Sequence, residues 1–417
     1  MSKKKFLAWL WVGLCVLAIF LVVPTARAIQ RFVSTNWGRS LFGYAVLAAV
    51  IIAFFSLVYF LVFRLNIRSP ANYIWLTVVA GLYVYFTLQL WHAPEEAVHF
   101  LEYGLLGYFL FRALSLTIKD KSIYLTAFLI GALVGTFDEL LQWTIPDRYW
   151  DFRDVALNAL ATGLFQVAVW KGIQPRIISE KTGSRSVRRV SILAAALVVI
   201  LGLCASNTPQ RVAVYARRIS FLSFLLKAEP MYEFTRKHED PEIGIFFSRL
   251  TLDGLKIQDT AMSDEWARIL REWRDKDYSR FLSTYSPLIH PFLYEMRIHI
   301  FRRDRKLEEA GKAKKEKVRR ENLFIAWKEN LILEKYFTLA LKKSSYRWDK
   351  QKTVDIEGKI DSARPYRSPV SAGRFQVKET TLWAGIVIFL AALAVLNLIH
   401  SRLKPAGRSH KAETRGV

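Results

Sequence analysis

The stretch IYLTAFLIGALVGTFDELLQWTIPDRYWDFRDVALNALATGLFQVAVW, residues 123–170, decides the fold of this chain. Its beginning and end are almost free of charge, which is typical of helices that cross a lipid bilayer. Five carboxylates lie between them, and an ionisable group near a bilayer is costly unless it has a partner, a proton, water or a function. The stretch therefore predicts two membrane-spanning helices with a polar cluster where they meet.

The composition of the chain of 417 residues also indicates a membrane protein. Hydrophobic residues make up 52% of it and aromatic residues 14%, which is too apolar for an ordinary soluble protein. The net charge of +24 would suggest a nucleic-acid partner in a soluble chain, but in membrane proteins basic residues gather in cytoplasmic loops. We therefore expect no nucleic-acid binding. The two cysteines, Cys15 and Cys204, lie in apolar segments and predict neither a disulfide framework nor a CxxC metal site.

Segments of about 20 nearly uncharged residues, each long enough to cross a hydrocarbon core of roughly 30 Å, recur along the chain. They predict an all-α multi-spanning membrane protein with about eight transmembrane helices, and a mixed, mostly helical extracytoplasmic domain before the last helix. The expected spans lie near residues 6–24, 41–63, 73–91, 97–117, 123–145, 154–171, 190–208 and 381–400.

The spans and the polar regions between them divide the chain into parts. We predict a membrane anchor or signal-like segment, a transmembrane domain, a basic cytoplasmic loop with a further helix, an extracytoplasmic soluble domain, and a last helix with a basic tail, at residues 1–40, 41–175, 176–208, 209–378 and 379–417. The first span follows SKKK and precedes Ala26-Arg27-Ala28, which also suits a cleaved signal peptide. Its apolar core is long for that role, which favours a retained anchor.

The distribution of basic residues predicts the orientation in the membrane. With the N-terminus in the cytoplasm, the inner loops and the C-terminal tail carry clusters of Lys and Arg, whereas an outer loop contains the acidic sequence HAPEE. Arg27, Arg31 and Arg39 in the first outer loop run against this trend. The positive-inside rule places both termini in the cytoplasm and residues 209–378 outside it.

Short elements are expected in the soluble region. IGIFFSRLTLDGLKIQ, residues 243–258, alternates and predicts a hairpin that turns at Asp253-Gly254. A helix is expected to begin at SDEWARILREW, with Ser263 as its N-cap. Residues 302–324 are expected to form one charged helix, with a solvated face or with contacts to anionic lipid or envelope polymer. Residues 345–378 are expected to form a loose return to the last span.

Polar residues at the ends of three predicted spans are expected to form one site. Because the fourth span runs inward, the fifth outward and the sixth inward, these ends lie at the same depth. The candidates for acid–base chemistry are a histidine and four carboxylates: His99, Glu102, Asp138, Glu139 and Asp154. The candidates for substrate binding are the nearby phenol, amides and guanidinium: Tyr103, Gln142, Arg148 and Asn158.

Some acidic residues of this region also have structural interpretations. Asp151 and Asp154 could cap the sixth helix by accepting hydrogen bonds from its free N–H groups. Asp147 is expected to face water in the loop. Arg148 is expected to pair with Glu139 or Asp154, because a guanidinium matches a carboxylate as a bidentate partner.

The predicted cluster is short of positive charge. A metal ion, a cationic ligand group or protonated carboxyls would restore the balance, and a protonated carboxyl is what a general acid needs. The sequence assigns neither a metal nor a cofactor. It contains no HExxH, GxSxG or Walker motif, so a covalent hydrolase is not supported, and whether the protein is an enzyme stays open.

HFLEYGLLGY followed by DELLQWTIPDRYWDFRDVALN resembles the VanZ-like family of bacterial membrane proteins, over roughly residues 45–175. The family pattern is Lys-x-x-His-x-x-x-Tyr-x-x-Leu-Gly, then Asp-Glu-x-x-Gln, Pro-x-Arg and Asp-x-x-x-Asn. It is matched at His99, Tyr103, Leu106, Gly107, Asp138, Glu139, Gln142, Pro146, Arg148, Asp154 and Asn158. The chain departs from residues frequent in the family at Glu96, Leu141, Asp147 and Ala161. The resemblance implies a protein of the bacterial cytoplasmic membrane with a role at the cell envelope, associated with lowered susceptibility to the glycopeptide teicoplanin.

Two functions of different classes agree with these features. In the first, the outward-facing site binds or acts on a membrane lipid or a lipid-linked envelope precursor. In the second, the protein is a non-catalytic scaffold whose polar cluster locks three helices together and whose residues 209–378 recruit an envelope protein. A transporter is less favoured, because the sequence shows neither an internal repeat nor paired broken helices.

Overall fold

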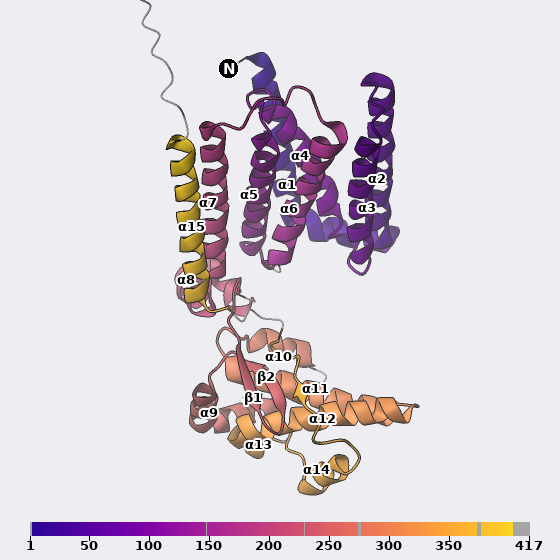
Figure 1. Ribbon diagram of the computed structural model, residues 1–417. Helices are drawn as coiled ribbons and strands as arrows, with labels where there is room; N and C mark the ends of the chain where they lie inside the picture. The colour runs from indigo at the N-terminus through magenta and orange to yellow at the C-terminus, as the bar shows by residue number, and fades with distance from the viewer. Residues whose placement is uncertain (1, 147, 229, 274–276, 373–376, 403–417) are drawn as a thin grey trace, which may run out of the picture. The chain divides into compact units, whose positions relative to one another are not determined.

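The computed structural model describes residues 2–146, 148–228, 230–273, 277–372 and 377–402, and the chain folds as two compact units (Figure 1). The membrane unit contains the residues up to Gly202 and the segment from Trp383 on, and the soluble unit contains Leu203–Leu382. Helices make up most of both units, and a small three-stranded sheet lies in the soluble one. The predicted fold class, an all-α multi-spanning protein with a mixed, mostly helical domain, is confirmed.

The membrane unit is built from α1 (Lys3–Asn36), α2 (Ser40–Tyr59) with a π-helical extension (Phe60–Arg64), α3 (Pro70–Gln89), α4 (Val98–Leu114), α5 (Ser122–Trp143), α6 (Phe152–Val167) with a π-helical extension (Ala168–Ile173), α7 (Ser184–Ala205) and α15 (Glu379–Arg402). In the described ranges, six helices are long and apolar enough to cross a membrane: α1, extended α2, α3, α5, α7 and α15. The shorter α4 and α6 pack against each other and against α5. All eight predicted spans are therefore helical, and six meet the length and composition of a span.

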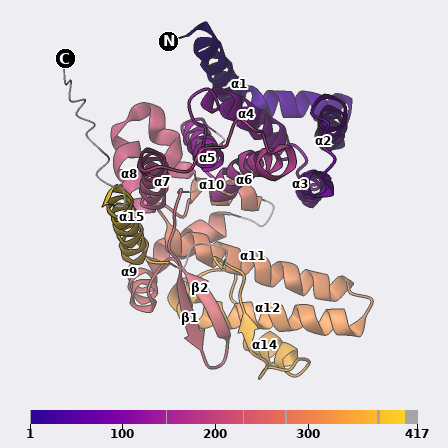
Figure 2. The same ribbon diagram turned by 45° about the horizontal axis from the view of Figure 1, so that its top comes forward.

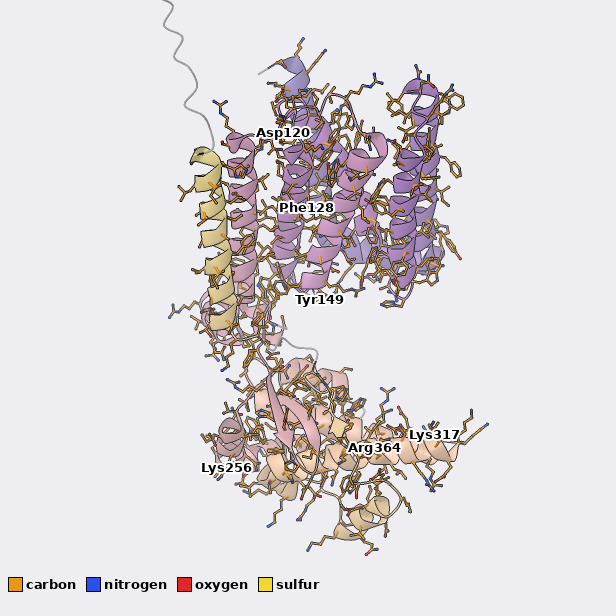
Figure 3. All side chains as sticks on the ribbon, viewed as in Figure 1. Asp120, Phe128, Tyr149, Lys256, Lys317 and Arg364 are labelled. Atoms are coloured by element: carbon orange, nitrogen blue, oxygen red, sulfur yellow. The ribbon has the colours of Figure 1, made fainter. Side chains whose placement is uncertain are left out.

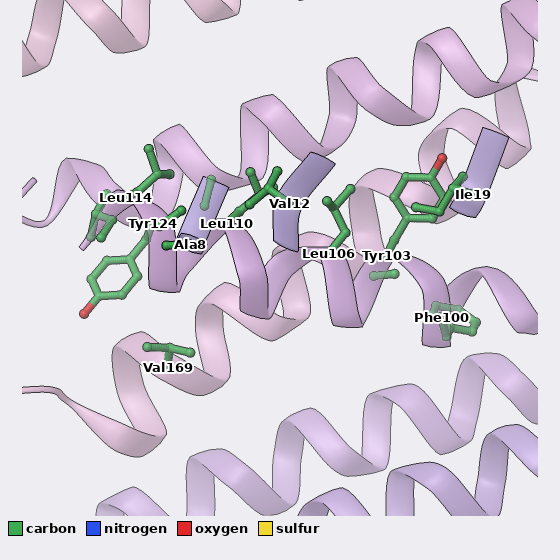
Figure 4. Packing of buried hydrophobic residues seen from close by; sticks show 14 of the residues in the cluster. Ala8, Val12, Ile19, Phe100, Tyr103, Leu106, Leu110, Leu114, Tyr124 and Val169 are labelled. Carbon is green, nitrogen blue, oxygen red and sulfur yellow. The ribbon is translucent and has the colours of Figure 1, made fainter. Parts of the chain in front are cut away.

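Helix α1 is longer than the predicted span, because it continues past Pro24 to Asn36. Pro24 has no N–H and so cannot donate a hydrogen bond within the helix. The hydroxyl of the next residue, Thr25, donates to the Val22 carbonyl oxygen of the preceding turn at 3.0 Å. The first half of α1 packs on α4 through a shared apolar cluster that includes Ala8, Val12 and Ile19 of α1 and Tyr103, Leu106 and Leu110 of α4 (Figure 4). The second half was not predicted, because its residues after Pro24 are more polar than a typical span.

Helices α5 and α6 approach closely because glycines of α5 face α6. A Cβ on Gly131 would lie 2.5 Å from the side chain of Thr162, and one on Gly135 would lie 2.7 Å from the Cβ of Asn158. Small residues four positions apart allow such close packing of membrane helices. The Thr162 hydroxyl also donates to the Tyr103 carbonyl oxygen of α4 at 3.3 Å. Helices α4, α5 and α6 thus form a tightly packed core.

Helices α7 and α15 lie side by side (Figures 1 and 2). The Ser184 hydroxyl donates to the His400 carbonyl oxygen at 2.8 Å. The start of α7 is held to the loop before α5, where the Ser186 hydroxyl donates to Asp120 at 2.6 Å. Asp120 and Tyr149 lie at opposite ends of the membrane unit (Figure 3). Since α7 begins at the Asp120 end, the chain leaves this unit on the side of Tyr149.

The soluble unit contains α8 (Pro209–Arg218), a 3-10 helix (Ser220–Lys227), β1 (Arg236–Asp240), β2 (Gly244–Ser248), α9 (Leu252–Glu272), α10 (Tyr278–Thr284), α11 (Pro291–Lys312), α12 (Glu316–Tyr336), α13 (Thr338–Lys343), α14 (Lys350–Glu357) and β3 (Tyr366–Arg367). Strands β1 and β2 are antiparallel, and β3 adds to β2 in parallel. Helices α11 and α12 pack together as a long helical hairpin (Figure 2). Met296, Ile300 and Leu333 are buried in the apolar core around this hairpin.

The hairpin predicted at Asp253-Gly254 is wrong. Strand β2 pairs with β1, which precedes it, and Leu252–Glu272 forms helix α9. Thr251 is the N-cap of that helix, because its side chain accepts a hydrogen bond from the N–H of Gly254 at 2.9 Å. The prediction of Ser263 as an N-cap is also wrong, since this residue is buried inside α9.

The segment 302–324 is two helices rather than the single helix predicted. Helix α11 ends at Lys312 and α12 starts at Glu316. Both helices bury one face against the other, and this packing outweighs the helical propensity of the sequence between them. The remainder, 345–378, is not loose throughout, because it contains α14 and the strand β3 that extends the sheet.

Candidate functional site

The ends of α4, α5 and α6 meet at one end of the membrane unit, as the sequence predicts. The Tyr103 hydroxyl of α4 donates to Oδ2 of Asp138 on α5 at 3.1 Å. On α4, Nδ1 of His99 lies 3.5 Å from Oε2 of Glu102, so these two side chains share the predicted face. Asp154 lies in the first turn of α6. Segments far apart in the sequence therefore bring the predicted acid–base groups together.

Glu139 and Gln142 form a hydrogen-bond network inside α5 and the loop that follows it. Nε2 of Gln142 donates to Oε1 of Glu139 at 2.7 Å, and the N–H of Asp151 donates to Oε2 of Glu139 at 3.3 Å. The Arg148 guanidinium donates to Oε1 of Gln142. The prediction that Arg148 pairs with Glu139 or Asp154 is therefore wrong among the described residues, because an amide oxygen takes that place.

The polar residues at the start of α6 have separate roles. Asp151 is the N-cap, as predicted, because its side chain accepts a hydrogen bond from the N–H of Arg153 at 2.7 Å. Asp154 is in the first helical turn and does not act as the cap. Asn158 is fully buried one turn deeper, and both polar atoms of its amide lack a hydrogen-bond partner in the described part of the chain. Asp147 lies outside the described residues.

A pocket of ≈ 530 Å³ opens at these helix ends. Its polar wall includes His99, Glu102, Asp138, Gln142, Arg148, Tyr149 and Asp154. Its apolar wall comes from α1 and the start of α2, with Ile19, Val22, Val23, Ala26, Ile29 and Phe42. Tyr103, Glu139 and Asn158 are buried behind the polar wall. The predicted site residues thus divide into those that reach the pocket and those that support it.

The contribution of α1 to the pocket is missing from the sequence prediction. Arg27, Gln30 and Arg31 line the pocket, and Nε2 of Gln30 donates to Oε1 of Glu95 at 2.6 Å. Arg39, just after α1, forms an ion pair with the same carboxylate. The sequence did contain a signal, because these arginines run against the positive-inside trend. The structure places Arg27 and Arg31 at the pocket, next to its acidic residues.

More positive charge lies at the cluster than the sequence analysis places there. The pocket is lined by five carboxylates, Glu95, Glu96, Glu102, Asp138 and Asp154, and by three guanidiniums, Arg27, Arg31 and Arg148. Two further guanidiniums pair with its acids, Arg39 with Glu95 and Arg153 with Glu96. With Glu139 behind the polar wall, six carboxylates lie near five guanidiniums, so a small deficit of positive charge remains. In the described ranges, no group of three His, Cys, Asp or Glu side chains is placed to hold a metal ion.

The fold and the site define a membrane protein of several spans with an amphipathic pocket at one end of its membrane unit. Residues 10–171 match the VanZ/LLP1 family model, so this part of the chain is VanZ-like. The predicted resemblance is thus confirmed, and the match includes most of α1. Glu96, where the family often has Lys, pairs with Arg153 at 3.2 Å. No curated protein and no solved structure matches the chain significantly.

Proposed function

We propose that the pocket binds the headgroup of a membrane lipid or a lipid-linked cell-envelope precursor. The observation that carries this proposal is the division of its walls, with apolar residues of α1 on one side and His99, Asp138 and Asp154 on the other. A lipid presents a polar headgroup and a hydrocarbon chain at the same place, so it matches both walls. The positive-inside distribution supports a pocket that faces away from the cytoplasm.

The side chains that reach the pocket are the ones that contact the ligand in this proposal. His99, with Glu102 beside it, and the carboxylates of Asp138 and Asp154 supply groups that can donate or accept a proton. Gln142 and Arg148 form the adjoining part of the wall. Glu139 is a positioning residue, because it holds Gln142 and the start of α6 from behind.

A role in teicoplanin tolerance follows from the family and is tested in a bacterial host whose tolerance depends on this chain. His99→Gln combined with Asp138→Asn is expected to abolish the tolerance at equal membrane expression, because both groups line the pocket. Asp264→Asn is the control, since its side chain in the soluble unit is 88% exposed. Unchanged tolerance in the double variant would contradict the role of these two groups.

The alternative function, a non-catalytic scaffold, is favoured by the buried Glu139 network. Glu139→Gln is expected to lower the melting temperature of the purified chain, because a buried donor left without its acceptor costs about 1–3 kcal/mol. Asp138→Asn is expected to change it little, since an amide oxygen can still accept from Tyr103. Scanning fluorimetry in detergent measures both. If the protein is a scaffold, both substitutions are expected to lower the melting temperature equally. Teicoplanin tolerance would then decrease only as far as the amount of folded protein decreases.

A further inference from the structure

Three arginines line the pocket without a carboxylate partner. Arg27 and Arg31 are one turn apart on α1 and so share a face, and Arg148 follows α5. In the described part of the chain none of the three forms an ion pair: Nε of Arg31 donates to the Arg27 carbonyl oxygen at 3.4 Å, and Arg148 donates to Gln142. An arginine is always charged, so the pocket offers three guanidiniums that no carboxylate engages.

Most carboxylates of the pocket are already engaged by other groups. Glu95 pairs with Arg39, Glu96 with Arg153 and Glu102 with His99, while Asp138 accepts from Tyr103. These four acids are thus already in contact with other groups. An anionic ligand in the pocket would therefore meet three guanidiniums that no carboxylate engages.

We propose that Arg27, Arg31 and Arg148 form a cradle for the phosphate or diphosphate of a lipid. The proposal deepens the proposed function and rests on it, because the pocket must take a lipid headgroup. A phosphate offers several terminal oxygens, and each guanidinium can donate two parallel hydrogen bonds to such oxygens. A carboxylate has only two oxygens and would leave part of the cradle unused.

The neighbourhood of the arginines indicates that the phosphate belongs to a lipid. Val22, Ala26 and Ile29 of α1 line the same pocket as Arg27, so a hydrocarbon chain finds apolar surface beside the anion. The volume of ≈ 530 Å³ is within the range of about 300–1,000 Å³ for small-molecule sites. In the polar wall that also contains Arg148, the buried Oδ1 of Asp138 has no hydrogen-bond partner among the described residues. This oxygen can accept from a hydroxyl or ammonium group next to the phosphate.

Arginines at a membrane boundary also bind lipid phosphates without a specific site, and the test must separate the two cases. Arg64 and Arg68 provide the matched control, because they belong to the same unit but do not line this pocket. Replacing either pair by glutamine removes the same charge. If the arginines form a cradle, only the replacement of Arg27 and Arg31 weakens the binding of a lipid phosphate. If the attraction is general, the replacement of either pair weakens it.

The experiment measures the thermal unfolding of the full purified chain in non-ionic detergent, with a polyprenyl phosphate, the corresponding polyprenol or inorganic phosphate added. A ligand that binds the folded state raises the melting temperature in a concentration-dependent way. Polyprenyl phosphate is expected to stabilise the wild type, and the other two compounds much less. Arg27→Gln with Arg31→Gln is expected to weaken this binding at least about tenfold, because a charged hydrogen bond contributes about 1.5–3 kcal/mol. Arg27→Lys with Arg31→Lys is expected to recover part of it.

Each remaining outcome overturns the cradle. Equal binding of polyprenol and polyprenyl phosphate would show that the pocket binds a lipid without recognising its phosphate. Equal stabilisation by inorganic phosphate would show that the arginines take free phosphate rather than a lipid. Equal loss in Arg64→Gln with Arg68→Gln would show general charge attraction. If no compound binds while His99→Gln with Asp138→Asn still abolishes tolerance, the cradle fails and the proposed function stands.

Discussion

Replacing Gly131 and Gly135 together by alanine is expected to lower the free energy of unfolding of the membrane unit by about 2–6 kcal/mol, taking about 1–3 kcal/mol for each overpacked position. The added methyl groups would lie 2.5 Å from the Thr162 side chain and 2.7 Å from the Asn158 Cβ. Both contacts are far shorter than van der Waals distance, and the Cβ of Asn158 is not a flexible tip that can move aside. Helices α5 and α6 must therefore separate.

The separation also affects the candidate site, because the two helices carry its wall. Asp138 follows Gly135 by one turn of α5, and Asp154 precedes Asn158 by one turn of α6. A shift of α6 changes the distance between these carboxylates and weakens the bond from the Asp151 N–H to Glu139. If the proposed function holds, the double variant is therefore expected to lose teicoplanin tolerance together with stability, in a host whose tolerance depends on this chain.

Thermal unfolding in detergent and the tolerance assay measure these two effects. Gly13→Ala with Gly81→Ala is the matched control, because a Cβ at either glycine meets no atom within 4 Å. Alanine has a higher helix propensity than glycine, so the control is expected to be as stable as the wild type or slightly more stable. A Gly131→Ala, Gly135→Ala variant that melts with the wild type would show that α5 and α6 are not packed this closely.

The spans could be predicted because an apolar run of sufficient length has few alternatives to a membrane helix. The polar second half of α1 could not be predicted. Arg27 and Arg31 are typical of a loop between spans, and the sequence does not show that they line a pocket. Their contact with the site depends on how α1 packs along α4, and this packing uses ordinary apolar residues such as Val12 that occur in many spans.

The meeting of His99, Asp138 and Asp154 could also be predicted, because the alternating direction of the spans brings their ends to one depth. The sequence could not assign the separate roles of Asp138 and Glu139. Adjacent residues on a helix point about 100° apart, so the rotation of α5 decides which carboxylate faces the pocket. That rotation is fixed by Gly131 and Gly135 against α6, a tertiary contact that the spacing of the acids does not contain.

The error at Asp253-Gly254 has a local cause. The pair is typical of a two-residue hairpin turn, but an acidic residue is equally favourable in the first turn of a helix. The Thr251 side chain decides between them by accepting the Gly254 N–H. Strand β2 then finds its partner in β1, on the other side in the sequence.

Replacing Glu329 by glutamine is expected to destabilise the soluble unit by about 3–5 kcal/mol, the usual cost of removing one partner of a buried ion pair. Glu329 is fully buried and joins α11, α12 and β3. Its Oε2 lies 2.6 Å from Nδ1 of His299, and its Oε1 accepts from Nε of Arg302 at 3.0 Å and from the Tyr366 hydroxyl at 2.6 Å. Glutamine keeps the size of the side chain but offers one acceptor oxygen and no charge.

The same network predicts the dependence of stability on pH. Burial alone would raise the pKa of Glu329, but His299, the Tyr366 hydroxyl and Arg302 outweigh it, so the pKa lies below its ordinary value. A carboxyl whose pKa is lower in the folded than in the unfolded state stabilises the fold fully above its unfolded pKa, about 4.3 for Glu. This stabilisation is lost as the pH falls through the lower folded value.

Chemical unfolding of the full chain, followed by near-UV circular dichroism between neutral and acidic pH, measures both effects. The difference between the wild type and Glu329→Gln is expected to be largest near neutral pH and to shrink below about pH 4.3, where protonation removes the same charge. Glu316→Gln is the control, since Glu316 is 61% exposed and pairs with an exposed arginine, a contact that contributes little. A difference that stays constant down to acidic pH would assign the loss to the changed hydrogen bonds, and the charge of Glu329 would then not be what holds β3 against the α11–α12 hairpin.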